Sequence, residues 1–505
     1  MNKAHLRTIL SVFLTVLLLV AETIAFLTIK KLNMLPDVYL VAAAVVLVLG
    51  WILCALLLIW PSKKKRYARR IIAIVLTVAI IAGCAVVTNV VGKLYNTMHS
   101  ITKPNTDTVS ISVYVMANDP AKTIQDAAGY SFGISYSAGD DSLNEALGSL
   151  QKELGTVETV VYNSVPEMVN ALYSGEVNAV LMDSAYVSLL EDIEVYADFD
   201  VKTKVLHEIM IEQLIVDPTV PETSNPDDDT QKEPAMKPFV VYLSGSDTRN
   251  PTLKRSRSDV NIIIVVNPET KQILMVNTPR DYFVANPAGN GVLDKLTHCG
   301  IYGIDCSVTA LSDLYDVDID YYAQINFYGF QTLIDSIGGI TVYNDVAFTS
   351  LSGAYYFPVG PIEMDGSQAL TFARQRHGLP GGDNARGKNQ MKVISAVIEK
   401  MTSGTTIISN YSEILSSLGG MFQTDFSMDQ ISQLVKMQLT DMASWNIQSF
   451  AVTGSGSSKI TYSIPGQYVY VMIPHEKTVA HASNLIDRVI AGETLTSSDM
   501  TVPAN

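Results

Sequence analysis

Residues 239–281 read FVVYLSGSDTRNPTLKRSRSDVNIIIVVNPETKQILMVNTPRD, and they predict three β-strands separated by polar turns. The strands are expected at Phe239–Leu243, Val260–Val266 and Gln272–Val276, where apolar residues run almost without interruption. Segments with helical spacing follow, so residues 239–505 are predicted to form one α/β/α domain around a central mixed sheet.

Helices alternate with two further strands in the rest of this domain. The strands are expected at Tyr321–Asn326 and Ile340–Tyr343. Apolar residues that recur every three or four positions predict the helices. These segments are Cys306–Tyr315, Phe327–Ile337, Gly366–Phe372, Asn384–Lys400, Tyr411–Leu418, Met428–Met437 and His475–Ile490.

A linker and a second α/β domain precede this domain. Residues 217–238 carry five prolines and a run of acids, a composition that does not form a packed core. Residues 104–216 alternate strand and helix patterns, so they are predicted to be an accessory α/β domain. Its stretch NALYSGEVNAVLMDSAY, residues 170–186, resembles the second lobe of extracellular solute-binding proteins. We expect a docking or spacer role for this domain rather than ligand binding.

Residues 1–103 are predicted to be a transmembrane region. Three apolar runs, at about residues 9–29, 38–60 and 71–91, are each long enough to cross a hydrocarbon core of about 30 Å as a helix. The loop at residues 61–70 carries six basic residues, whereas the loop between the first two runs has only Lys30 and Lys31. The positive-inside rule therefore predicts a multi-pass protein of the cell membrane, with its N-terminus in the cytoplasm and residues 104–505 outside.

The charge distribution argues against a nucleic-acid partner. The formal net charge is −15, and only two of the fifty acidic residues, Glu22 and Asp37, lie in the first 103 residues. The part predicted to be extracellular is therefore strongly acidic and repels nucleic-acid phosphates.

Arginine usage gives the sharpest indication of chemistry. Residues 104–237 contain no arginine, whereas residues 238–402 contain seven. Arginine is the better bidentate ligand for phosphate oxygens, so the cluster predicts a site for a phosphorylated substrate. Scattered salt bridges with the many acids are the alternative. The seven are Arg249, Arg255, Arg257, Arg280, Arg374, Arg376 and Arg386.

Acidic residues lie at the ends of the same strands. Asp247 follows the first strand, Asp259 enters the second, and Asp281 follows the third. Sites of α/β sheets are found at strand ends, and carboxylates there can hold Mg²⁺ together with phosphate oxygens. The alternative for these aspartates is turn formation and helix capping.

A later cluster combines arginines with helix breakers. Arg374 and Arg376 are two positions apart, and the following glycines and proline predict that the helix ends there, which would let both side chains converge. Asp383, Arg386 and Gln390 have the spacing of one face of the next helix. Near the start of that helix they would suit an anion, although Asp383 also suits an N-cap.

Other catalytic patterns are absent from the sequence. There is no P-loop lysine motif, no GxSxG elbow and no histidine pair with metal spacing. Cys299 and Cys306 either form a disulfide outside the cell or remain two buried thiols, and the sequence does not decide between these states.

At these residues the chain resembles the LytR-CpsA-Psr family of cell-wall ligases. The motifs occur in the family's order and approximate spacing, and together they are highly specific. They are SGSDTR from Ser244, RSD from Arg257, TPRD from Thr278, DKLTHCGIYG from Asp294, INFYGF from Ile325, IDSIGGI from Ile334, DGSQALTFARQR from Asp365 and GDNARGKNQ from Gly382. Three spans followed by an accessory domain resemble the layout of the capsule-attaching members.

The resemblance implies an enzyme, a glycan phosphotransferase of the LytR-CpsA-Psr type. Such an enzyme takes a polymer, such as a capsular polysaccharide or a teichoic acid, from a polyprenyl-pyrophosphate carrier. It attaches the polymer to peptidoglycan through a phosphodiester, with Mg²⁺ as the cofactor. A hydrolase that uses water as the acceptor and a non-catalytic sensor of wall precursors are the alternatives, and the sequence does not identify the polymer.

Matching the motifs residue by residue implies the roles of the site residues. Asp247 and Asp259 are expected to hold Mg²⁺, and Asp383 is the acidic partner of the pyrophosphate-binding residues. Apart from the motifs, the chemistry needs a carboxylate as general base for the sugar hydroxyl, and either Asp281 or Asp383 is expected to serve. The residues expected to bind the substrate are Arg249, Arg280, Lys295, Arg374, Arg376, Arg386 and Gln390, of which Arg280, Arg374 and Arg376 are also expected to be catalytic. The residues that form either the wall of the family's lipid tunnel or ordinary core are Ile325, Phe327, Phe330, Leu333, Ile337 and Phe372.

Overall fold

The computed structural model divides the chain into two compact units. One unit contains residues 1–102, 401–419 and 426–444, and the other contains residues 103–400, 420–425 and 445–505. The structure describes residues 3–59, 66–102, 106–135, 141–214, 237–247, 252–403, 414 and 418–503. The helix predicted at Tyr411–Leu418 lies outside the described residues except for its positions 414 and 418.

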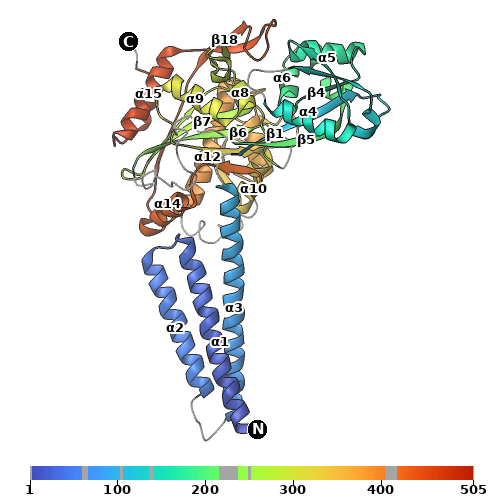
Figure 1. Cartoon of the computed structure of the whole chain (residues 1–505). Helices are drawn as coiled ribbons and strands as arrows, with labels where there is room; N and C mark the ends of the chain where they lie inside the picture. The colour runs from blue at the N-terminus through green and yellow to red at the C-terminus, as the bar shows by residue number, and fades with distance from the viewer. Residues whose placement is uncertain are drawn as a thin grey trace, which may run out of the picture. The chain divides into compact units, whose positions relative to one another are not determined.

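The first unit is built on three long apolar helices. α1 packs against both α2 and α3 (Figure 1). All three helices are long and apolar enough to cross a membrane, over Thr8–Leu32, Asp37–Ile59 and Arg69–His99. Three long apolar helices are therefore present where the sequence predicted the membrane spans. The helices of this unit are α1 (Lys3–Leu32), α2 (Asp37–Ile59), α3 (Arg66–Ile101) and α14 (Met428–Asp441).

The second unit begins with the accessory domain, residues 106–214, which has a five-stranded sheet in the order β3-β2-β4-β1-β5. Alternate side chains of β1 point to opposite faces of the sheet. Ile111 and Val113 pack in a cluster with Leu143 of α4, whereas Tyr114 packs in another cluster with Leu172 of α5. Its strands are β1 (Thr106–Met116), β2 (Ser131–Ser135), β3 (Glu158–Tyr162), β4 (Ala179–Asp183) and β5 (Thr203–Leu214). Its helices are α4 (Asp141–Leu154), α5 (Val165–Ser174), α6 (Val187–Leu190) and α7 (Phe199–Lys202), with 3-10 turns at Ile124–Ala127, Ser184–Tyr186 and Glu194–Tyr196.

The predicted mixed sheet is present, and it has the order β16-β11-β6-β7-β8-β17. β6 is parallel to β11 and antiparallel to β7, and β8 is antiparallel to β7 and parallel to β17. The strands are β6 (Phe239–Ser246), β7 (Ser258–Asn267), β8 (Gln272–Asn277), β11 (Tyr321–Asn326), β16 (Phe422–Thr424) and β17 (Asn446–Ala451).

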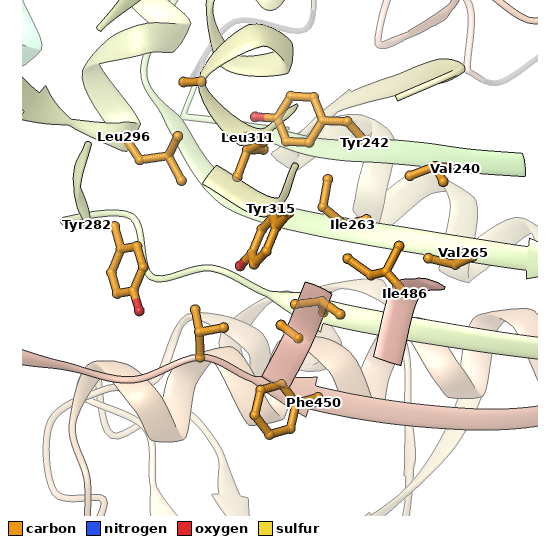
Figure 2. Packing of buried hydrophobic residues seen from close by; sticks show 14 of the residues in the cluster. Val240, Tyr242, Ile263, Val265, Tyr282, Leu296, Leu311, Tyr315, Phe450 and Ile486 are labelled. Carbon is orange, nitrogen blue, oxygen red and sulfur yellow. The ribbon is translucent and has the colours of Figure 1, made fainter. Parts of the chain in front are cut away.

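Helices cover both faces of this sheet, which confirms the predicted α/β/α architecture. Ile263 of β7 faces a large apolar cluster that includes Leu311 of α9 and Ile486 of α15 (Figure 2). Its neighbour Ile262 faces the other side and packs with Met391 of α12. The remaining helices are α8 (Leu296–Cys299), α9 (Ile304–Tyr315), α10 (Phe327–Ser336), α11 (Gly366–Arg374), α12 (Asp383–Thr402) and α15 (Glu476–Ile490), with 3-10 turns at Pro287–Gly289, Gly300–Tyr302 and Ser497–Met500.

The described part of the mixed-sheet domain also has four two-stranded antiparallel sheets. They are β9 (Phe283–Ala285) with β10 (Leu293–Lys295), β12 (Ile340–Asn344) with β15 (Gly360–Met364), β13 (Phe348–Thr349) with β14 (Tyr356–Phe357), and β18 (Gly454–Lys459) with β19 (Val469–Pro474). Cys299 and Cys306 lie in the core as two free, buried thiols, and the Cys306 Sγ is 3.3 Å from Asn286 Oδ1.

The accessory domain shares a hydrophobic core with the mixed-sheet domain. Leu189 of α6 belongs to the same buried cluster as Ile301, Ile464 and Val469, which come from the later domain. Burying apolar area is the main favourable term in association, so this cluster holds the two domains together. The domain boundary predicted at residues 217–238 falls mostly on residues outside the described ones and stays a prediction.

Gly387 lets α12 approach the end of β8, because a Cβ at this position would overlap the side-chain amide of Asn277. We predict that Gly387→Ala lowers the free energy of unfolding by about 1–3 kcal/mol, the usual cost of overpacking. A Cβ at Gly148 of α4 would meet no atom within 4 Å, so Gly148→Ala should instead stabilise by about 0.5–1 kcal/mol. Denaturant unfolding of the full chain in detergent measures both, and equal signs would contradict the close approach.

Candidate active site

Four strand ends meet at one edge of the mixed sheet. Ser246, the last residue of β6, pairs with Ser258 at the start of β7 and with Asn326 at the end of β11. Asn277, the last residue of β8, pairs with Ile262 of β7. Residues that follow or open these strands are therefore brought together, as the sequence predicted for the aspartates.

A β-bulge at the start of β7 sets the direction of the Asp259 side chain. Gly245 pairs with Val260 and Ser246 pairs with Ser258, so Asp259 is the extra residue. Successive side chains of a regular strand point to opposite faces, yet Asp259 and Val260 line the same cavity. A Cβ on Gly245 would lie 2.7 Å from the Val260 Cβ, so the residue opposite the bulge must be glycine.

A cavity of about 320 Å³ lies at this edge, and we call it the site cavity. This volume is in the usual range for small-molecule sites. Its charged and amide-bearing lining residues are Glu191, Asp247, Arg257, Asp259, Arg280, Asn326, Arg374, Arg376, Arg386 and Gln390. Its apolar lining residues are Leu243, Val260, Ile325, Phe327, Phe330, Leu370, Ala373 and Ile394.

Helix ends place the later arginines in the site cavity. α11 ends at Arg374 and the next residue, Gln375, is extended, so Arg374 and Arg376 both reach the cavity. The Arg374 guanidinium lies 4.3 Å from the centre of the Phe327 ring. Both arginines are exposed, and neither forms an ion pair within the described part of the chain. They are therefore available to a ligand.

One face of α12 supplies the rest of the cationic lining. Arg386, Gln390 and Ile394 are spaced four apart and all line the site cavity. The helix therefore presents a charge near its start and an apolar side chain further along the same face, which suits a ligand with a charged head and an apolar tail.

Asp247 and Asp259 interact electrostatically across the site cavity. Burial and the nearby Asp259 raise the pKa of Asp247 above its usual value. Burial alone would raise the pKa of Asp259 as well, but Arg280, Arg257 and Arg386 outweigh burial and lower it. The strongest pair is Arg280 Nη1 with Asp259 Oδ1, at 2.7 Å. Asp259 is therefore an anion inside a cationic site.

Two of the predicted site residues lie behind the cavity rather than in its lining. Lys295 is 5% exposed, and its Nζ lies 2.8 Å from Asp192 and 3.6 Å from Asp281. Asp281 also lies 3.7 Å from Arg280 Nε. The position of Lys295 therefore does not support direct contact with the substrate. The position of Asp281 likewise does not support a role as the general base. Arg249 lies outside the described residues, and Asp383 begins α12 with a side chain that is not described.

The predicted lipid-wall residues divide into two groups. Ile325, Phe327 and Phe330 line the site cavity. Phe372 instead stacks with Phe348 and Phe357 in a buried aromatic group. The other two, Leu333 and Ile337, are partly and fully buried and do not line this cavity.

Sequence reasoning gave Arg257 no role beyond membership of the arginine cluster, and it missed Glu191 and Asp192. Arg257 stands in the same RSD motif as Asp259, so the motif itself was the available signal. Glu191 lines the cavity and Asp192 pairs with Arg257, but both belong to the accessory domain. Nothing in their local sequence, which follows α6, marks them as site residues.

A family model agrees with this geometry. The model described as the LytR_cpsA_psr family matches residues 216–483, more than half of the 505 residues. The chain belongs to the LytR-CpsA-Psr family. The resemblance inferred from the motifs is thereby confirmed.

Two curated relatives of this LytR-CpsA-Psr chain carry the same name. A protein of Enterococcus faecalis, named polyisoprenyl-teichoic acid–peptidoglycan teichoic acid transferase TagU, is 36% identical over 200 residues, which are 39% of this chain and 65% of that protein. A protein of Oceanobacillus iheyensis with the same name is 36% identical over 245 residues, which are 47% of this chain and 72% of that protein. The matches thus span about two thirds of the relatives' lengths.

The crystal structure of Bacillus subtilis TagV aligns with a TM-score of 0.43 and 24% identity, over 52% of this chain and 99% of that one.

Two arginines of the site cavity should differ in their effect on stability. The Arg280 side chain is only 13% exposed and pairs with Asp259 and Asp281, so we predict that Arg280→Gln lowers the free energy of unfolding by about 3 kcal/mol. Arg374 is exposed, so Arg374→Gln should change it by less than about 0.5 kcal/mol. Denaturant unfolding of both variants of the full chain tests this contrast, which equal losses would contradict.

Proposed function

We propose that this chain transfers a glycan from a polyprenyl-pyrophosphate carrier to peptidoglycan and forms a phosphodiester bond. The observation that carries the proposal is the lining of the site cavity. Five arginines, at positions 257, 280, 374, 376 and 386, face the same space as an apolar wall that includes Phe327 and Phe330. Arginines suit the pyrophosphate, and the wall suits the polyprenyl chain.

The names of the relatives support the same chemistry. The Enterococcus and Oceanobacillus proteins are named for polyisoprenyl-linked teichoic acid as donor and peptidoglycan as acceptor. Membrane anchoring by three apolar helices would keep the site near a donor that is itself anchored in the bilayer. The names of these relatives specify teichoic acid, whereas the layout of three spans and an accessory domain resembles the capsule-attaching members, so both polymers stay proposals for this chain.

The transfer itself needs positioning and charge neutralisation rather than a protein nucleophile. A hydroxyl of the peptidoglycan sugar attacks the phosphorus that bears the glycan. The bond from that phosphorus to the bridging oxygen breaks, and polyprenyl phosphate leaves with the bond's electron pair. Arg374 and Arg376, which are free of ion pairs within the described residues, are placed to bind the leaving phosphate oxygens. The proton of the hydroxyl goes to a carboxylate, for which Asp383 stays the predicted residue.

The two aspartates of the site fit a Mg²⁺ ion. Asp247 uses Oδ2 for Arg257, and Asp259 uses Oδ1 for Arg280 and Thr297. The other oxygen of each carboxylate accepts no hydrogen bond from the described residues, and both side chains line the site cavity. Mg²⁺ takes one or two carboxylates together with phosphate oxygens. Asp247 and Asp259 would hold it, and when bound it would supply positive charge to the pyrophosphate.

Transfer and hydrolysis can be separated by their products. Wild-type chain in detergent, incubated with polyprenyl-pyrophosphate-linked glycan and peptidoglycan, should give glycan linked to the wall. Arg374→Gln and Arg376→Gln should each reduce kcat/KM about 10- to 100-fold, because a charged hydrogen bond is worth roughly 1.5–3 kcal/mol. Free glycan phosphate as the main product would indicate a hydrolase, and binding without any product would indicate a sensor.

The metal assignment predicts a changed Mg²⁺ requirement. Asp247→Asn and Asp259→Asn keep the side-chain shape but remove a charge, so each should raise the Mg²⁺ concentration for half-maximal transfer and lower the maximal rate. EDTA should stop transfer by the wild type. Mg²⁺ titrations that superimpose on the wild-type curve would exclude these two aspartates as the metal site.

The loop charges support an orientation with the site outside the cell and the N-terminus in the cytoplasm. Protease added to intact, wall-stripped cells should therefore cut within residues 217–238 and spare residues 61–70. Immunoblotting of the fragments measures this, with lysed cells as the control. Cleavage of residues 61–70 in intact cells would reverse the proposed orientation.

A further inference from the structure

A partly buried carboxylate of the accessory domain, Asp192, whose side chain is 18% exposed, contacts two cations of the mixed-sheet domain. Asp192, which follows α6, accepts a hydrogen bond from Arg257 Nη1 at 3.2 Å through Oδ1. Its Oδ2 accepts one from Lys295 Nζ at 2.8 Å. The Arg257 and Lys295 side chains are 7% and 5% exposed, so water screens these pairs weakly. Each oxygen of one carboxylate therefore fixes a different cation.

Both cations are connected to the aspartates of the site cavity by further ion pairs. Arg257 Nη2 donates to Asp247 Oδ2 at 3.1 Å. Lys295 Nζ lies 3.6 Å from Asp281. Asp281 in turn lies 3.7 Å from Arg280, whose Nη1 donates to Asp259 at 2.7 Å. Asp192 therefore begins two series of ion pairs. One runs through Arg257 to Asp247, and the other runs through Lys295, Asp281 and Arg280 to Asp259.

The charge state of Asp192 suits this position. Burial would raise its pKa, but the contact with His298 and the charges of Lys295 and Arg257 hold the pKa well below its usual range. His298 is fully buried, and its Nε2 lies 3.7 Å from Asp192 while its Nδ1 lies 2.7 Å from Asp294. Asp192 is thus a permanent anion at neutral pH.

The surrounding interface fixes the same segment of the mixed-sheet domain. Arg257 also donates to the carbonyl oxygen of Ser188 at 3.1 Å. The backbone N–H of Arg255 donates to the Thr108 carbonyl at 2.9 Å, and its side chain reaches Gln213 at 3.0 Å. The RSD segment is therefore held by the accessory domain on its approach to the bulge. A spacer attached only through a linker would have no such contacts.

We propose that Asp192 is a positioning residue of the transfer reaction, supplied to the site by the accessory domain. It holds Arg257 and Lys295 so that Asp247 and Asp259 face the site cavity in the arrangement that transfer requires. The proposal rests on the proposed function, and it replaces the docking or spacer role expected for this domain.

Two roles of Asp192 predict different measurements. If it positions the cations, its neutralisation leaves Arg257 and Lys295 each with one carboxylate less, and they shift toward Asp247 and Asp281. The rate of transfer then falls by roughly 10- to 100-fold, which is the usual effect of removing a residue that orients the metal ligands of a site. The cavity also becomes more positive, so the affinity for an anion stays the same or increases. If Asp192 only supports the fold, rate, anion affinity and unfolding temperature fall together.

The experiment uses the full chain in detergent. Asp192→Asn removes the charge, Asp192→Glu keeps it, and Asp200→Asn removes an exposed carboxylate of α7 in the same domain as the matched control. For each we would measure kcat for wall-linked product, the affinity for inorganic pyrophosphate by calorimetry in EDTA, and the unfolding temperature. We expect a low kcat with unchanged or tighter pyrophosphate binding in Asp192→Asn only, with Asp192→Glu recovering most of the rate.

The outcomes that overturn the proposal are distinct from failure of the proposed function. Wild-type chain that neither transfers glycan nor binds pyrophosphate would refute the function before any variant is compared. A folded Asp192→Asn variant with the wild-type kcat, or one that loses rate and pyrophosphate affinity together, would refute the positioning role. If Asp192→Asn does not fold, the double variant with Lys295→Met is compared with Lys295→Met alone. Equal kcat in these two would support a role through Lys295, and a wild-type rate in the double variant would refute it.

Discussion

The pairing of buried arginines with carboxylates at one edge of the mixed sheet is the constraint on which the site depends. A buried cation is tolerated only when an anion and hydrogen bonds compensate for its lost hydration. Arg280 meets this condition through Asp259 and Asp281, and Arg257 meets it through Asp247 and Asp192. Arg374 and Arg376 are instead left at the surface of the cavity. The inner arginines thus organise the acids, and the outer arginines remain available to phosphate.

Local patterns were sufficient to predict much of this arrangement. The apolar run of β7 predicted a strand of a central sheet in an α/β/α domain, and Ile262 and Ile263 do pack against helices on opposite faces. The breakers after Arg374 predicted the end of α11, and the spacing of Arg386 and Gln390 predicted their common face. In each case the information lies within a few residues, which is the range over which periodicity acts.

Features that depend on distant segments were not predictable in the same way. The edge strand β17, NIQSFA, has few β-branched residues and is a strand because it pairs with β8, some 170 positions earlier in the chain. Phe372 resembles the apolar residues that line the cavity, and only the tertiary contacts with Phe348 and Phe357 place it elsewhere. Asp192 and Glu191 enter the site from another domain, so no motif in the mixed-sheet domain contains them.

The bulge at Asp259 also determines where the chain can gain or lose residues without reorienting this carboxylate. The segment between β6 and the bulge closes a loop, and the free energy of loop closure rises only slowly with length. Residues added to or lost from that loop would not change the direction in which the Asp259 side chain points. Removal of Ser258, in contrast, would restore a regular ladder with Asp259 opposite Ser246 and turn its carboxylate toward the core around Tyr242. During divergence, length variation should therefore accumulate before Arg257 and stop at the bulge.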